Sequence, residues 1–354
     1  MPLNLFPPEI CSQIYALACT DDGYTGRSLA AVSRYIHETS SPYKFQSIAL
    51  PNAYRASLFA SILGKTPPHL RGVAYLFVAN DDFDIDGPGS RDSGTKTTSS
   101  RRSITSMFSS FVGSSAKLPP QTVNPMKDHD TDIIEAVLKI LRLIAPTLRT
   151  LSISFECRWI NSTSLFSVET SFPALSSLTE LNLNYRAPTD ALFNHFVFHF
   201  PASFPSLRRL DISGLKLLSY RFELFGCITK IAPSLTHLRL PAKMALMNVP
   251  FVSPTTWPPT YRRSDDDNLP ATLGRVLIQL NGPHGYTCPG QRLYQTGCTR
   301  CRLLAMATTD GKFVALEAQS DDTWQKNRER LENDWKDRIG GGEGSWNEES
   351  AVYE

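Results

Sequence analysis

The chain has 354 residues, 41% of them hydrophobic and 20% charged, which is enough apolar sequence for a core and excludes disorder throughout. Lys and Arg number 36 against 34 Asp and Glu, so the net charge is only +2 and gives no indication of a nucleic-acid partner. The seven cysteines form no dense disulfide framework, and we therefore expect reduced thiols and a location in the cytoplasm or nucleus.

Two further classes of protein are not expected. The N-terminal sequence MPLNLFPPEI lacks the basic and apolar regions of a secretory signal. No apolar run approaches the roughly 20 residues that a helix needs to cross a bilayer, so we expect no membrane contact.

Residues 1–50 predict a compact unit of helices. Pro7 and Pro8 can open the first helix, because the first N–H groups of a helix have no partner within it. Apolar residues then recur at helical spacing and form one stripe on each of two predicted helices. These residues are Ile10, Ile14, Leu17 and Ala18 in the first helix, and Leu29, Val32 and Ile36 in the second.

The next two segments differ in composition. Residues 51–79 contain a first repeat-like unit, with the motif LRGVAY beginning at Leu70. Residues 80–130 are rich in Ser, Thr and Gly and predict a disordered insertion. Its Ser and Thr residues beside Arg101 and Arg102 fit either a plain flexible linker or a segment that is regulated by phosphorylation, and both interpretations stay open.

A repeated pattern occupies residues 131–280. The motif L-x-x-L-x-[LI] begins at Leu148, Leu178, Leu207 and Leu235, at spacings of 30, 29 and 28 residues, and a weaker copy begins at Leu273. Helical patterns lie between the motifs. A strand plus a helix in every 28 to 30 residues is typical of a leucine-rich-repeat solenoid, an α/β fold in which stacked repeats share one core. An ordinary α/β domain with one parallel sheet is the alternative.

Residues 281–320 predict an irregular region, and the number of repeats after residue 240 stays open. His284, Cys288, Cys298 and Cys301 have a spacing that could supply four ligands to a structural zinc ion. A single C-x-x-C is only half of a strong zinc signature, so we favour free, partly buried thiols and expect no metal.

Residues 321–354 predict a last helix and a tail. Asp321 to Ile339 has Trp324, Leu331 and Trp335 on one side of a helix, which suits either a cap on the last repeat or a helix that docks on a partner. We expect the acidic tail beyond the following glycines to be disordered.

Sequence motifs for catalysis are missing. The chain contains no nucleotide-binding loop, serine-hydrolase elbow or zinc-protease motif. His195 and His199 lie four residues apart, but no third ligand is evident nearby. The paired basic residues, such as Arg208 with Arg209, fit solvated surface charge. We therefore expect a non-catalytic protein without a cofactor.

The first 50 residues resemble an F-box of the fungal type. That family begins with Leu-Pro-x-Glu-Ile, which here reads Phe6-Pro7-Pro8-Glu9-Ile10, and its second helix ends in Val-[Cys/Ser]-[Arg/Lys], which here reads Val32-Ser33-Arg34. Phe6 replaces the usual Leu, and Tyr35 or Ile36 stands where the family often has Trp. Both replacements keep apolar bulk, and an F-box followed by leucine-rich repeats is a recurrent pairing.

The resemblance implies a substrate-recognition subunit of an SCF-type cullin-RING ubiquitin ligase. The F-box would dock on the adaptor subunit, and through it on the cullin, while the repeats would bind an unknown target protein. The residues expected to contact the adaptor are Phe6, Pro7, Pro8, Ile10, Ile14, Leu17, Leu29, Val32 and Ile36. The alternative is a leucine-rich-repeat scaffold for protein–protein interaction without a ligase function.

The target would contact polar positions on the concave face of the predicted solenoid. In each motif the apolar residues point into the core, and the residues between them point out along the concave sheet. The mixture of charges at these positions suits a protein surface better than an apolar metabolite. The positions are Thr150, Ser152, Ser154, Glu180, Asn182, Asn184, Arg209, Asp211, Ser213, His237 and Arg239.

Overall fold

The structure is a computed structural model, and it describes eight main stretches of the chain. These are residues 7–80, 129–156, 173–186, 204–212, 224–242, 270–280, 310–317 and 324–348, together with residues 245, 303, 307, 308 and 351. Several predictions fall outside them: most of the insertion at 80–130, the histidine pair His195 and His199, and the possible zinc ligands from His284 to Cys301.

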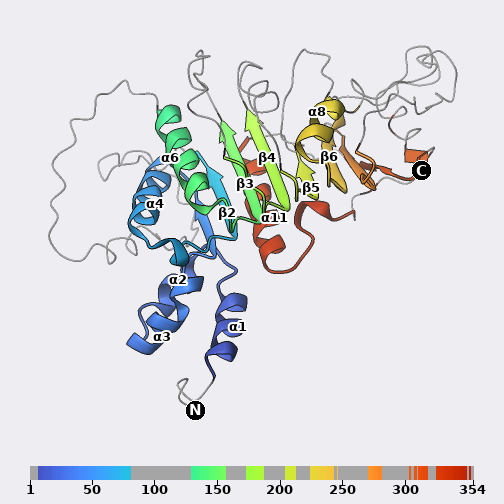
Figure 1. The fold of residues 1–354 in the computed structure, drawn as a ribbon. Coiled ribbons are helices and arrows are strands. Elements are labelled where there is room, and N and C mark those ends of the chain that lie inside the picture. The colour runs from blue at the N-terminus through green and yellow to red at the C-terminus, as the bar shows by residue number, and fades with distance from the viewer. Residues whose placement is uncertain are drawn as a thin grey trace, which may run out of the picture.

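The described residues form an eight-stranded parallel sheet in which the strands follow one another in sequence order (Figure 1). The expectation of an α/β protein is therefore confirmed, with each strand beside the one that precedes it. The strands are β1 (Ser47–Leu50), β2 (Tyr75–Ala79), β3 (Thr150–Glu156), β4 (Glu180–Arg186), β5 (Arg209–Asp211), β6 (His237–Pro241), β7 (Arg275–Gln279) and β8 (Phe313–Leu316).

The strands pair so that equivalent residues of the repeated motif stand side by side. Thr150 pairs with Glu180, Glu180 with Arg209, Arg209 with His237, and His237 with Arg275. The next position forms a continuous apolar row under the sheet, because its side chains point to the opposite face. This row contains Leu76, Leu151, Leu181, Leu210, Leu238 and Val276.

The register corrects the start of the first repeat. Tyr75 pairs with Thr150, so Val73 and not Leu70 is the counterpart of Leu148. Val73 is fully buried like Leu148, whereas Leu70 is only half-buried at the end of a short 3-10 helix, Pro68–Leu70. The motif was misaligned because the leucine position is occupied by a valine.

Two strands lie where the sequence predicts none. β1 falls within the segment assigned to the N-terminal unit, and β8 falls within the region expected to be irregular. Both strands have four residues and lack the L-x-x-L-x-[LI] motif. Their apolar residues nevertheless continue the same pairing at the two ends of the sheet.

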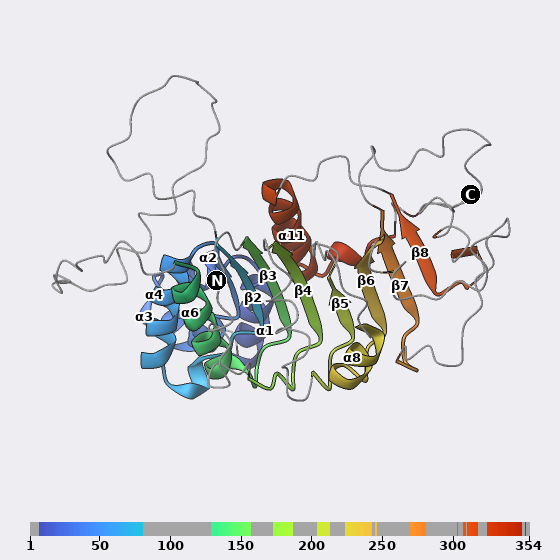
Figure 2. The ribbon, with the colours of Figure 1, turned by 90° about the horizontal axis from the view of Figure 1, so that it is seen from above.

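Three helices cover one face of the sheet (Figures 1 and 2). They are α4 (Ala53–Lys65), α6 (His129–Ile144) and α8 (Leu224–Ile231). Asn52 caps α4 by accepting a hydrogen bond from the backbone N–H of Arg55 at 3.0 Å, which satisfies one free donor of the first turn. The main core lies between these helices and the inward side chains of the strands. Ile133, Val137 and Leu141 of α6 are buried there.

Threonines at the start of the strands tie neighbouring repeats together. The hydroxyl of Thr179 donates to the carbonyl of Arg149 at 3.0 Å, and that of Thr236 donates to the carbonyl of Arg208 at 2.9 Å. These are equivalent positions of different repeats, so the same contact recurs along the sheet edge.

A three-helix unit projects from the end of the sheet near β1 (Figure 1). It consists of α1 (Pro8–Ala18), α2 (Tyr24–Leu29) and α3 (Arg34–Ser40), and the 3-10 helix Ser41–Tyr43 leads from it towards β1. Its small interior contains Cys11, Tyr15 and Ile36. Gly26 lies so close to the chain before β1 that an added Cβ would be 2.5 Å from the carbonyl oxygen of Lys44.

The other face of the sheet carries the C-terminal part of the chain (Figure 2). Helix α11 (Trp324–Ile339) and the 3-10 helix η9 (Gly344–Trp346) lie there. The predicted helix is confirmed, but it packs on β2, β3 and β4 and does not cap the last repeat. The acidic tail beyond the glycines that follow α11 is expected from the sequence to be disordered, but its residues 345–348 have a described conformation. No described helix has the length and apolar character required to cross a membrane.

Candidate protein-binding surfaces

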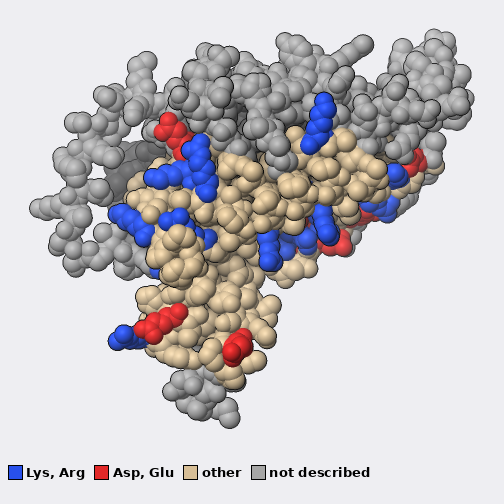
Figure 3. All heavy atoms as spheres, viewed as in Figure 1, with Lys and Arg blue, Asp and Glu red and all other residues tan. Residues whose placement is uncertain are grey.

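The N-terminal unit exposes an apolar face on α1. Ile10, Ile14 and Leu17 are 40%, 43% and 78% exposed, and they lie along one side of the helix at i, i+4 and i+7. Val32, between α2 and α3, is 63% exposed. On the side of this unit that Figure 3 shows, few side chains are charged. Large apolar side chains that cluster on a surface mark a site of protein interaction.

The structure divides the residues that the sequence analysis assigns to adaptor contact. Pro7 and Pro8 are exposed at the start of α1, beside the apolar face. Leu29 packs partly against the interior of the unit. Ile36 is only 5% exposed and lies inside that interior, so in this structure it holds the three helices together and does not reach a partner. Phe6 lies outside the described residues.

Neither the Cys19 thiol nor the ion pair of Arg34 and Glu38 gives this unit a chemical role or much stability. Burial, together with the charge of Asp21, raises the pKa of the Cys19 thiol to about 11, so this thiol stays protonated and unreactive at neutral pH. The guanidinium of Arg34 pairs with Glu38 at 2.9 Å, but both side chains are exposed, so the pair adds little stability. The distinguishing feature of the unit is therefore its apolar face.

The second surface is the face of the sheet where the sequence analysis places target contacts. Most of these side chains are polar and buried, and neighbouring strands satisfy some of them directly. The amide of Asn182 donates to the hydroxyl of Ser152 at 3.0 Å, and that of Asn184 donates to Ser154 at 3.1 Å. The buried members are Thr150, Ser152, Ser154, Glu180, Asn182, Asn184, Asp211 and Arg239. Arg209 and His237 are partly exposed, and Ser213 lies outside the described residues.

The C-terminal segment covers this face through an apolar part and a polar part. In the apolar part, Leu331, Trp335 and Ile339 of α11 pack on Phe77 and Ala79 of β2. The rings of Phe77 and Trp335 lie 5.8 Å apart. Burial of several large side chains contributes several kcal/mol, so α11 is an integral layer of the fold.

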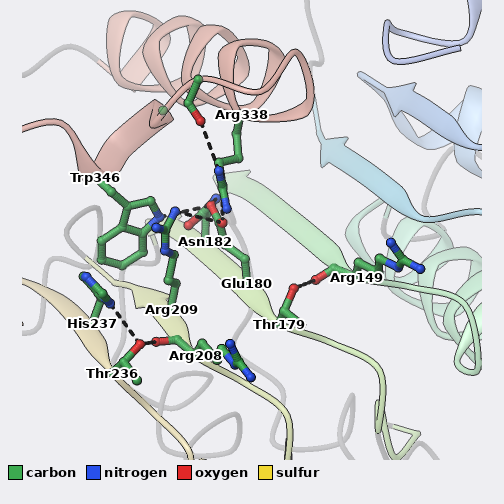
Figure 4. Close-up of polar contacts among 12 residues, drawn as sticks. Arg149, Thr179, Glu180, Asn182, Arg208, Arg209, Thr236, His237, Arg338 and Trp346 are labelled. Carbon is green, nitrogen blue, oxygen red and sulfur yellow. Dashed lines mark hydrogen bonds and ion pairs between the residues drawn. The ribbon is translucent and has the colours of Figure 1, made fainter. Parts of the chain in front are cut away.

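The polar part centres on Glu180 (Figure 4). Its carboxylate accepts hydrogen bonds from the indole N–H of Trp346 at 3.0 Å and from Nε of Arg338 at 2.7 Å. The guanidinium of Arg209 is 4.0 Å from the same carboxylate, and the amide of Asn182 lies 3.4 Å from it. A buried carboxylate is tolerated when cations and donors surround it, as they do here.

Trp346 rests on two further side chains of the sheet. Its ring lies 5.9 Å from that of His237 in an edge-to-face arrangement, and the guanidinium of Arg209 lies 5.8 Å from the ring centre. Burial, with the positive charge of Arg209, lowers the pKa of His237, which favours the neutral imidazole under the indole.

The chain around Trp346 is fixed at both sides. The guanidinium of Arg239 donates to the carbonyl oxygen of Ser345 and, at 2.6 Å, to the side chain of Gln279. Beyond the tryptophan, Glu348 pairs with Arg275 at 3.3 Å. The residue Ala351 then forms an isolated antiparallel bridge with Leu316 of β8.

No local pattern in the sequence predicts that residues of the tail belong to this surface. Trp346, Arg338 and Glu348 all lie after residue 320, in a segment treated as a cap and a disordered tail. One signal was present: Trp346 is a large aromatic residue within a run of Gly, Glu and Ser, where an unburied indole would be unusual.

Comparisons with known proteins assign no family. No protein-family model matches the chain, and no curated protein matches it. Within the described residues no three His, Cys, Asp or Glu side chains are grouped to hold a metal ion. The two surfaces, one open and apolar and one covered and polar, are therefore the features on which a functional conclusion depends.

Proposed function

We propose that this chain is an F-box protein with leucine-rich repeats that serves as a substrate-recognition subunit of an SCF-type ubiquitin ligase. The observation that carries the proposal is the exposed apolar face of α1, formed by Ile10, Ile14 and Leu17 on a three-helix unit that stands apart from the main core. These residues match the positions by which an F-box docks on its adaptor.

The leucine-rich-repeat assignment has its own support. Motifs 28 to 30 residues apart become strands that pair at equivalent positions, in sequence order. Such stacking buries a face that a single repeat could not bury alone. An ordinary α/β domain rarely places all of its strands in sequence order, because its sheet usually grows in both directions from a central strand.

The proposed role needs no catalytic residue in this chain. A rigid body with the adaptor at one end and a target along the repeats raises the local concentration of the target at the site of ubiquitin transfer. The unit and the sheet are joined by short contacts that suit such a body. The side-chain amide of Gln46 donates to the backbone carbonyl of Ala16 at 2.7 Å, and the hydroxyl of Ser47 donates to the backbone carbonyl of Asp21.

The proposal is tested by charging the apolar face. The variants are the double substitution Ile10→Asp and Ile14→Asp, and a matched control, Tyr54→Asp, which changes a 75% exposed apolar residue on α4. Each full-length chain is co-expressed with the SCF adaptor and recovered by affinity purification. Circular dichroism and the melting temperature establish that each chain is folded.

We expect the wild type and Tyr54→Asp to bring the adaptor with them, and the double variant to lose it by at least about 100-fold, because a buried charge at an interface is costly. Failure of a folded wild-type chain to bind the adaptor would contradict the ligase role. The alternative, a repeat scaffold without a ligase, would then be preferred.

A further inference from the structure

The polar part of the C-terminal contact has the form of a bound peptide. Trp346 and Glu348 lie across the strands, and the residues beneath them come from four neighbouring strands at one position of the repeat. That position is occupied by Glu180 in β4, Arg209 in β5, His237 in β6 and Arg275 in β7, which pair in this order. We call these four residues the reading row.

Each member of the reading row recognises a different feature of the segment. Glu180 accepts the indole N–H at 3.0 Å, and Arg209 and His237 provide the surface on which the ring lies. Two residues further along the tail, the carboxylate of Glu348 meets Arg275 at 3.3 Å. The row therefore selects an aromatic residue followed, after one residue, by an acidic one.

The residue before the tryptophan is also restricted. Ser345 is buried, and Arg239 binds its backbone carbonyl oxygen. Gly344, one residue earlier, has φ +58°, and an added Cβ would lie 2.6 Å from the carbonyl oxygen of Asp334. The chain thus needs small residues immediately before the aromatic side chain, and these allow it to turn from α11 onto the sheet.

The tail does not satisfy all of the polar groups around the row. Oδ1 of Asn182, Nη1 of Arg209 and Nε of Arg239 are buried without a hydrogen-bond partner among the described residues, as is the hydroxyl of Ser345. Each such group costs free energy in comparison with a segment that would satisfy it. A segment that satisfied these groups would bind the row more tightly than the tail does.

We propose that the reading row is a peptide-binding site for a target protein, and that residues 344–348 occupy it as an internal substitute. The ligand is a segment with one or two small residues, a tryptophan, one further residue and an acidic residue. The identification of this ligand as a ligase target rests on the proposed function, but the binding site itself does not.

Competition explains how such a site works. A tail joined to the same chain is present at an effective concentration in the millimolar range, so it blocks weak ligands and admits only those that bind more tightly. The apparent affinity of an external ligand is its intrinsic affinity multiplied by the fraction of molecules in which the row is free. Loosening the tail must therefore strengthen the binding of an external peptide.

The test uses a fluorescein-labelled peptide with the sequence of residues 343–351, EGSWNEESA, and full-length chains in which the tail is altered. Fluorescence anisotropy measures its binding to the wild type and to Trp346→Ala. We expect the variant to bind the peptide at least about tenfold more tightly than the wild type. The same peptide with Ala in place of Trp should not bind either chain.

A charge exchange tests the register of the ligand on the row. Adding Arg275→Glu to the Trp346→Ala chain should weaken peptide binding by about tenfold, and a peptide with Arg in place of the residue corresponding to Glu348 should restore it. A general loss of structure would not be rescued in this way. Glu348→Arg is a second tail variant, should Trp346→Ala not fold, because its side chain is only at the edge of the contact.

Equal binding to both chains, or no binding to folded variants, would overturn the proposal. A wild-type chain that forms dimers in solution while Trp346→Ala stays monomeric would also overturn it, because the occupant would then be the tail of a second copy. The assay contains no adaptor, so its failure is distinct from failure of the α1 experiment, which does not involve the tail.

Discussion

The N-terminal unit and the sheet face beneath the C-terminal segment differ in the kind of side chain that they expose and bury. On α1 the apolar side chains Ile10, Ile14 and Leu17 are exposed, whereas on the sheet polar side chains such as Ser152 and Asn182 are buried. The first region lacks a covering, and the second is covered by its own chain. Exposure of apolar groups indicates a missing partner, and burial of polar groups indicates a partner that is already present.

This contrast explains why the two surfaces require different experiments. A partner of α1 has nothing to displace, so a substitution there acts directly on binding. A partner of the reading row has to replace the tail, so a substitution in the tail acts in the opposite direction and increases binding. The difference between the two regions is tested most directly by making the same substitution in each of them.

The largest expected difference comes from shortening a leucine in each region. Leu331→Ala removes a side chain that is buried between α11 and β2, and we expect it to lower the free energy of unfolding by about 2–5 kcal/mol. Leu17→Ala, the matched control, removes an exposed side chain and should change it by less than about 0.5 kcal/mol. Urea denaturation measures both. Equal losses would mean that α1 is covered, or that α11 is not.

An ion pair from each region gives a smaller difference. Glu180 and Arg338 form a hydrogen-bonded pair in which the carboxylate is buried, and a double-mutant cycle with Glu180→Gln and Arg338→Ala should give a coupling energy of about 1–3 kcal/mol. The exposed pair of Arg34 and Glu38 should give about 0.3–0.5 kcal/mol. A coupling near zero at Glu180 would show that Arg338 does not hold the tail.

The smallest effect is a dependence on pH through His237. Its pKa is lowered from 6.5, chiefly by burial and then by Arg209 and Arg275, against the opposing charges of Glu348 and Glu180. The unfolded chain therefore binds this proton more readily than the folded one. The contribution of the neutral His237 imidazole to the free energy of unfolding is complete above pH 6.5. It decreases as the pH falls through the lowered pKa.

This pH dependence can be separated from that of other groups. Burial raises the pKa of Asp334, which acts in the opposite sense, so the folded chain gains stability as this carboxyl takes up its proton. Of these two titrations, His237→Gln removes only that of the histidine. The difference in unfolding free energy between the wild type and this variant should decrease between about pH 7 and pH 5. A constant difference would contradict the assignment.

Much of the fold could be predicted because its signal repeats along the sequence. The repeated motif predicts strands that pair in sequence order, since one period determines both the pattern and the stacking. The motif begins at Leu148, Leu178, Leu207 and Leu235. Single events have no such repetition. β8 lacks the motif, and at Val73 a β-branched residue fills the leucine position, so local pattern alone misplaces or misses them.

The covering of the sheet could not be predicted for a different reason. Trp346 and Glu180 are 166 residues apart, and no local rule connects them. The sequence correctly places Glu180, Asn182 and Arg239 on one face, but which segment covers that face depends on packing over the whole chain. Ile36 shows the same limit at short range, since its apolar spacing fits either an interior or a partner-facing position.

Hydrogen–deuterium exchange of the full-length chain, with and without the SCF adaptor, tests the contrast between the two regions most directly. We expect the adaptor to slow exchange in α1 and its neighbours, within residues 7–40. We expect the amides of residues 343–348 to be protected equally in both samples. Adaptor binding that leaves exchange in α1 unchanged, or rapid exchange throughout the tail of the free chain, would contradict the proposed difference between the two regions.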